Sequence, residues 1–138
     1  MLQTLYPHLL GFHGLFRWVV LAAAVATIFV AFSGWSGTKP ANANLLRFSV
    51  IFAIAMDIEF LAGLLLYFSA SSNLRSTFAA HSALMFLAVI CAHVAGACSR
   101  KARTDQMKYR GAAIACTISL LIMLVGIPWR PLIGLSLY

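Results

Sequence analysis

The most informative property of this sequence of 138 residues is how little charge it contains. Charged residues make up 9% of the chain, and only three residues are acidic. A soluble domain of this size has roughly 25% charged residues. Hydrophobic residues make up 62%, and the mean hydropathy is +0.93. The composition therefore predicts a protein that lipid, rather than water, surrounds.

The sequence also lacks linkers that would divide it into domains, and it lacks cysteine spacings typical of disulfide frameworks or zinc sites. No linker or low-complexity tract interrupts it, so we expect a single transmembrane domain over residues 1–138. The three cysteines form no Cys-x-x-Cys or zinc-like spacing, and we expect small buried thiols. Without a Cys-x-x-Cys-His motif, covalent c-type haem attachment is excluded. We also expect no cleavable signal peptide, because the start has no basic segment.

Four apolar runs of about 19 to 24 residues follow one another, at residues 9–32, 45–68, 78–98 and 111–129. Each is long enough to cross a hydrocarbon layer of about 30 Å at 1.5 Å per helical residue. Short loops make consecutive spans antiparallel neighbours. The sequence therefore predicts an all-α fold, an integral membrane four-helix bundle with up-down-up-down topology.

The net charge of +7 resembles that of a nucleic-acid-binding protein, but the basic residues lie between the apolar runs, where they orient helices and meet lipid head groups. We therefore expect no nucleic acid partner. Seven basic residues flank the first and third loops and three lie on the opposite side: Lys39, Arg47, Arg100, Lys101, Arg103, Lys108 and Arg110 against Arg17, Arg75 and Arg130. The positive-inside rule then places both termini on the non-cytoplasmic side of a bacterial inner membrane.

Three charged residues, Arg17, Asp57 and Glu59, lie inside the first two spans, and each needs a partner in lipid. Arg17 and Glu59 lie at similar depths from the outer side, so we expect an intramembrane ion pair between them. Asp57 lies about 200° around the helix from Glu59, so the two cannot both face one neighbour well. Asp57 is then protonated, turned toward a cofactor or partner subunit, or part of a proton relay.

Two histidines, His13 and His81, each stand a few residues inside the outer end of a span. The first and third helices of such a bundle run parallel, so the two imidazoles can converge at one level. A b-type haem takes two axial imidazoles from facing helices. Met85 continues the face of His81, and Arg17 can pair with haem propionates. The small residues along the same face suit close helix packing without a ligand equally well.

Two further residues complete this pattern. Arg75 lies just outside His81 and is a second candidate for the propionates. His93 is twelve residues after His81, so it lies about 18 Å deeper. It has no histidine partner at that level, which argues against a second haem with two histidine ligands.

Short motifs along nearly the whole chain resemble a group of small bacterial four-helix membrane proteins described as cytochrome b-like. The first helix opens with FHGLFRW at 12–18, and the second ends with FLAGLLLYF at 60–68. The third opens with His81 followed by Met85, and the fourth ends in Ile-Pro-Trp at 127–129. The resemblance implies a four-helix membrane bundle that holds haem.

One departure from that group concerns the second helix, which carries Asp57 where the relatives usually carry a histidine. The departure removes one potential ligand. Our first hypothesis is a b-type cytochrome-like electron-transfer protein or subunit that exchanges electrons with quinone or a periplasmic carrier. The alternative is a non-catalytic accessory subunit of a larger respiratory or photosynthetic complex. A small proton or solute carrier using Asp57 and Glu59 is a third class, disfavoured because no inverted repeat or broken helix is present.

Overall fold

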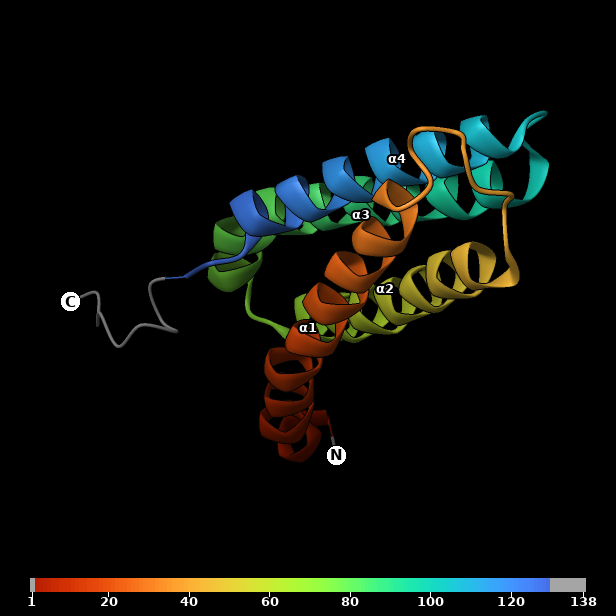
Figure 1. The fold of residues 1–138 in the computed structure, drawn as a ribbon. Helices are drawn as coiled ribbons and strands as arrows, with labels where there is room; N and C mark the ends of the chain where they lie inside the picture. Colours follow the sequence, from red (N-terminus) through yellow and green to blue (C-terminus); the bar gives the residue numbers. More distant parts are fainter. Residues whose placement is uncertain (1, 130–138) are drawn as a thin grey trace.

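The computed structural model describes residues 2–129, which form four helices joined by short loops (Figure 1). Their bounds are α1 Leu2–Phe32, α2 Ala43–Ser69, α3 Ser72–Lys101 and α4 Asp105–Gly126. Residues 2–129 contain no strand, and the predicted all-α fold is confirmed. Arg130 and the C-terminal end, which entered the predicted orientation, lie outside the described residues.

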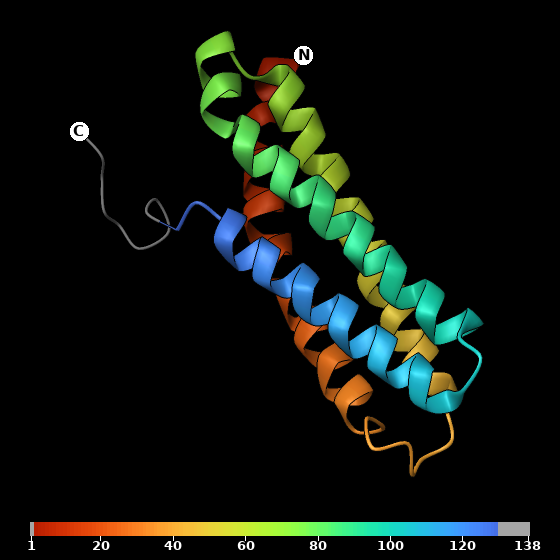
Figure 2. The same cartoon turned by 90° about the horizontal axis from the view of Figure 1, so that it is seen from above.

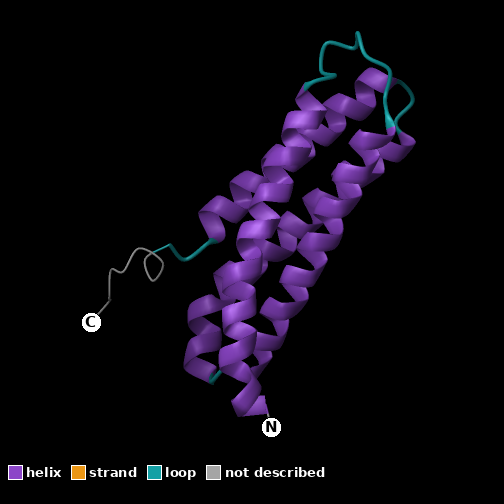
Figure 3. Cartoon of the chain, turned by 60° about the horizontal axis from the view of Figure 1, so that its bottom comes forward, coloured by secondary structure: helices purple, strands orange, loops and turns teal. Residues whose placement is uncertain are grey.

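The helices form one bundle in which each helix packs against two neighbours (Figures 1 and 2). α2 packs against α1 and α3, and α4 packs against α3 and α1. This up-down-up-down order places α1 and α3 on a diagonal. Figure 3 shows the loops after α1 and α3 together at one end of the bundle, with the N-terminus at the other.

All four helices are long and apolar enough to cross a membrane. Large apolar side chains cover their outward faces: Phe29 is 78% exposed and Val125 is 77% exposed. Water would oppose such a surface, whereas hydrocarbon accepts it. The chain is therefore a multi-pass membrane protein in a lipid environment.

The interior is built mainly from small side chains. Seven alanines from three helices have no exposed surface: Ala24, Ala31, Ala88, Ala92, Ala95, Ala112 and Ala113. Small residues let helix backbones approach closely, which is the main source of packing attraction in lipid. Phe52 and Tyr109 are the largest fully buried side chains.

Hydroxyl groups connect neighbouring helices within this interior. Thr27 Oγ1 on α1 donates to the Phe48 carbonyl on α2 at 3.1 Å. Ser49 and Ser99 join α2 to α3 through their hydroxyls at 2.8 Å. Ser119 Oγ on α4 donates to the Ala88 carbonyl on α3, also at 2.8 Å. Three of the four helix contacts thus carry a hydrogen bond between helices.

The helix ends follow local sequence signals. The Asn42 and Thr104 side chains cap α2 and α4 by accepting from the backbone N–H three residues later. The predicted fourth span continues to Trp129, but α4 ends at Gly126. Ile127 precedes Pro128 and is extended, because a proline disfavours helical backbone at the residue before it. α1 and α3 are longer than the predicted spans, since a helix can continue beyond the hydrocarbon layer.

Candidate functional site

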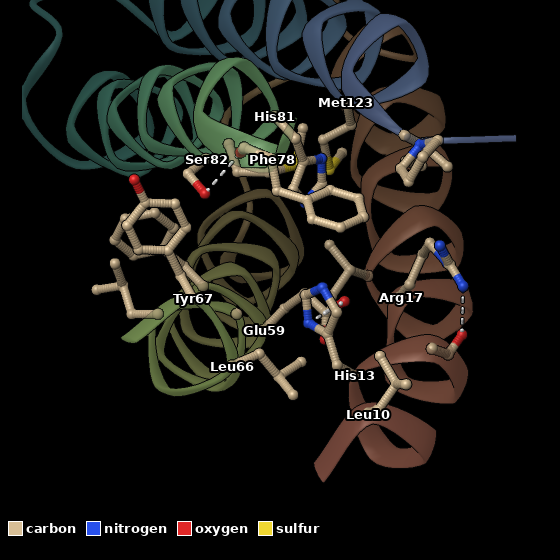
Figure 4. A pocket seen from close by; sticks show the side chains of 18 of the residues that line it. Leu10, His13, Arg17, Glu59, Leu66, Tyr67, Phe78, His81, Ser82 and Met123 are labelled. Atoms are coloured by element: carbon tan, nitrogen blue, oxygen red, sulfur yellow. Dashed lines mark hydrogen bonds and ion pairs between the residues drawn. The ribbon is translucent and has the colours of Figure 1, made fainter. Parts of the chain in front are cut away.

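A cavity of about 430 Å³ opens between the helices at the end of the bundle that carries the N-terminus. All four helices line it, mostly with apolar side chains. Figure 4 shows His81 and Met123 on one side of the cavity and His13 and Glu59 on the other. The volume lies within the range of about 300–1,000 Å³ that is typical of small-molecule sites.

The four residues predicted from the sequence to bind a cofactor all line this cavity: His13, Arg17, His81 and Met85. The rings of His13 and His81 have centroids 6.4 Å apart, with an interplanar angle of 81°. They come from α1 and α3, the diagonal helices. Arg75, the second candidate for pairing with propionates, is not among the described residues that line the cavity.

The imidazole of His81 is held by the end of α4. Its Nδ1 lies 2.7 Å from the Gly126 carbonyl oxygen. A carbonyl only accepts, so Nδ1 carries the proton and donates it, which leaves the lone pair on Nε2. The Gly126 carbonyl is available because the last carbonyls of a helix have no partner in that helix. The proline that ends α4 therefore also orients His81, a link that the sequence analysis missed.

His13 lies against Glu59 of α2. Its Nδ1 is 3.0 Å from Glu59 Oε1, which is within ion-pair distance, but the two atoms form no hydrogen bond. Glu59 Oε2 is buried and has no hydrogen-bond partner within residues 2–129. Gly63, one turn after Glu59, makes room for the ring, because a Cβ there would lie 3.2 Å from His13 Cε1.

The structure differs from the predicted Arg17–Glu59 ion pair. Arg17 lies one turn after His13, and its Nη2 donates to the Gly14 carbonyl at 3.1 Å, while His13 occupies the place beside Glu59. Depth along the helices could not distinguish the two, since both share one face of α1. The imidazole fits against Gly63, whereas the long guanidinium turns back along α1.

The donor set at this cavity suits two axial ligands of one iron. A metal ion that joins two imidazole nitrogens at about 2 Å each separates the ring centres by about 6 Å. An acceptor adjoins Nδ1 of each histidine, and neither Nε2 takes part in a hydrogen bond within residues 2–129. Metal-binding histidines commonly donate the N–H of the other ring nitrogen to such an acceptor, as His81 does to the Gly126 carbonyl. No group of three or more His, Cys, Asp or Glu that could hold a bare metal ion occurs in the described chain.

Asp57 and His93 form a second acid–histidine pair outside the cavity. His93 Nε2 on α3 lies 2.9 Å from Asp57 Oδ1 on α2. The two carboxylates of α2 thus face different neighbours, as their angular separation predicts: Glu59 faces α1 and Asp57 faces α3. His93 was expected to have no histidine partner at its level, and its pairing with Asp57 was not predicted.

No family model, curated protein or solved structure matches the chain. The resemblance to small cytochrome b-like proteins therefore rests on the short sequence motifs, and the arguments for function come from the cavity itself.

Proposed function

We propose that the chain is a membrane-embedded b-type cytochrome-like electron-transfer protein or subunit. One haem b would lie between α1 and α3 near the outer leaflet, with His13 and His81 as axial ligands. The observation that carries the proposal is the approach of two imidazoles across the bundle at 6.4 Å, each with an acceptor at Nδ1.

The surrounding residues would prepare the two histidines for this role. The Gly126 carbonyl fixes the tautomer of His81 and directs its free nitrogen away from α4. Glu59 places a carboxylate beside His13, which favours the same tautomer there and raises the basicity of Nε2. Haem bound in the cavity would supply a one-electron redox couple.

The remaining lining residues fit the other parts of a haem. Arg17 brings a guanidinium to the cavity for a propionate, and Met85 and Met123 supply polarizable apolar surface. The electron partner would be quinone or a periplasmic carrier. The membrane would be a bacterial inner membrane. The distribution of Lys and Arg supports an orientation with both termini on the non-cytoplasmic side, and the site would then lie near the outer surface.

An absorption spectrum of the detergent-extracted protein tests the proposal. We expect wild-type protein from haem-supplemented cells to show a reduced α-band of b type. His13→Ala and His81→Ala should each remove at least about nine-tenths of that band, because a single imidazole holds the iron weakly. His93→Ala is the matched control, since it removes an imidazole from α3 outside the cavity, and it should keep the wild-type band.

Three outcomes would contradict the proposal. A colourless wild-type protein that co-purifies with large subunits would favour the accessory-subunit alternative. A band that survives in both His13→Ala and His81→Ala would place the haem elsewhere. If the protein transports protons or a solute in liposomes, and Asp57→Asn abolishes this transport without unfolding the protein, the chain is a carrier instead.

A further inference from the structure

The Asp57–His93 pair lies on the outer surface of the bundle, in the membrane-spanning parts of α2 and α3. The side chain of Asp57 is 42% exposed and that of His93 is 54% exposed. Apolar side chains surround the pair on the same face, with Ile54 53% and Ile90 43% exposed. Two ionisable groups therefore face the region that hydrocarbon would fill.

The hydrogen bonds of this pair are incomplete. His93 Nε2 and Asp57 Oδ1 satisfy each other at 2.9 Å. No other hydrogen bond within residues 2–129 reaches His93 Nδ1 or Asp57 Oδ2. Lipid tails supply neither donors nor acceptors, so each unpaired group is costly at this depth.

The two unpaired atoms are complementary in either neutral form of the pair. When His93 is protonated and Asp57 is ionised, Nδ1 carries a proton and Oδ2 accepts. When the proton lies on Asp57 Oδ1, the neutral imidazole carries its remaining proton on Nδ1, and Oδ2 again accepts. Each copy of the chain thus presents one donor and one acceptor side by side.

We propose that the α2–α3 face, defined by Ile54, Asp57, Ile90 and His93, is the interface of a symmetric homodimer. A twofold axis brings the same surface of two copies together. If a residue of one copy contacts a second residue of the other copy, the reverse contact forms as well. His93 Nδ1–H then donates to Asp57 Oδ2 of the partner subunit, and the reverse bond forms as well. The four groups close a ring in which every polar atom has a partner.

This inference does not depend on any cofactor, because the pair lies outside the cavity. A second copy supplies the required donor and acceptor together with apolar surface for Ile54 and Ile90. A small lipid-dissolved molecule with hydroxyl groups could supply the polar atoms alone. Crosslinking between copies and chemical modification of His93 separate these two occupants.

Crosslinking of the full chain in liposomes tests the interface without changing the pair. In a cysteine-free background, Ile90→Cys lies one turn from His93 on the proposed interface. Leu121→Cys on α4 is the matched control, because it is 56% exposed on a face that carries no such pair. With a flexible bismaleimide, we expect at least about tenfold more crosslinked dimer from Ile90→Cys than from Leu121→Cys. Equal yields, or monomer from both, would overturn the proposal.

Variants of the pair then test its role in the interface. Asp57→Asn and His93→Ala should each reduce the Ile90→Cys crosslink at least about tenfold, while helicity by circular dichroism is kept. The double variant Asp57→His with His93→Asp exchanges donor and acceptor in both copies and should restore the crosslink. A crosslink that is insensitive to all three would refute the polar ring. If the wild-type protein is monomeric and His93 is protected from chemical modification only when a quinol is added, the occupant is the small molecule instead.

Discussion

Gly63 determines how closely the imidazole of His13 approaches α2. A Cβ at this position would lie 3.2 Å from His13 Cε1, which is already a tight contact, and a longer side chain would occupy the place of the ring. We predict that Gly63→Leu displaces His13 from Glu59 and lowers the free energy of unfolding by about 1–3 kcal/mol, as overpacking of an interior does. SDS titration of the bilayer-reconstituted protein, followed by circular dichroism, measures the change.

The chain offers a matched control at Gly11 on α1, where an added Cβ would meet no atom within 4 Å. Gly11→Leu should leave the unfolding free energy within about 0.5 kcal/mol of wild type, because it crowds nothing. Equal losses in the two variants would show that contact with His13 does not explain the effect, because the change from Gly to Leu by itself favours the helix at both positions.

The number and direction of the helices could be predicted from the sequence, whereas their positions along one another could not. Four apolar runs and their short loops were enough to predict four antiparallel helices, and His13 and His81 share a cavity because both stand near the same end of their spans. Apolar length and depth from the nearest loop are local properties of the chain, so they can be read without knowledge of side-chain packing.

The position of α3 along the axis of α2 depends on how the side chains of the two helices pack, and it could not be predicted from the sequence. α2 ends at Ser69 and α3 begins at Ser72. If residues equally far from this turn lay opposite each other, Asp57 would face Leu84. In the structure Asp57 pairs with His93, which is nine residues further along α3. That shift amounts to about 13 Å. The same limit explains why depth alone could not decide whether His13 or Arg17 meets Glu59.

The hydroxyl groups of Ser49 and Ser99 connect the same two helices, since both are buried and lie 2.8 Å apart. We predict that Ser49→Ala and Ser99→Ala each destabilise the fold, and that the double variant loses less than the sum of the two. The coupling energy should be about 0.6 kcal/mol, which is typical of hydrogen bonds between membrane helices. A double-mutant cycle by SDS titration provides the value.

Ser82 provides the control for this cycle, because its hydroxyl donates only to the Phe78 carbonyl of the same helix. Ser82→Ala should show no coupling to Ser49→Ala. A coupling near zero between Ser49 and Ser99 would mean that apolar packing alone sets the register of α2 and α3.

Across the whole molecule, small side chains lie inside the bundle and large apolar side chains lie outside, which is the reverse of a water-soluble bundle. Alanines fill the centre, while Phe29, Val125 and other large apolar side chains point outward. Close packing of the backbones and hydrogen bonds between helices, three of them made by hydroxyl groups, hold the bundle together, because burial from lipid gives no hydrophobic gain. The cavity interrupts this close packing at the end of the bundle that carries the N-terminus.

This distribution leads to a prediction about paired substitutions inside and outside the bundle. Ala92 has no exposed surface on α3, so Ala92→Leu must separate the helices and should cost about 1–3 kcal/mol. Val125→Ala removes a side chain that is 77% exposed, and lipid tails can fill the vacated space, so its effect should stay within about 0.5 kcal/mol. SDS titration measures both. The reverse order, with Val125→Ala the more damaging, would mean that another protein surface covers α4, and it would support the accessory-subunit alternative over a freestanding cytochrome.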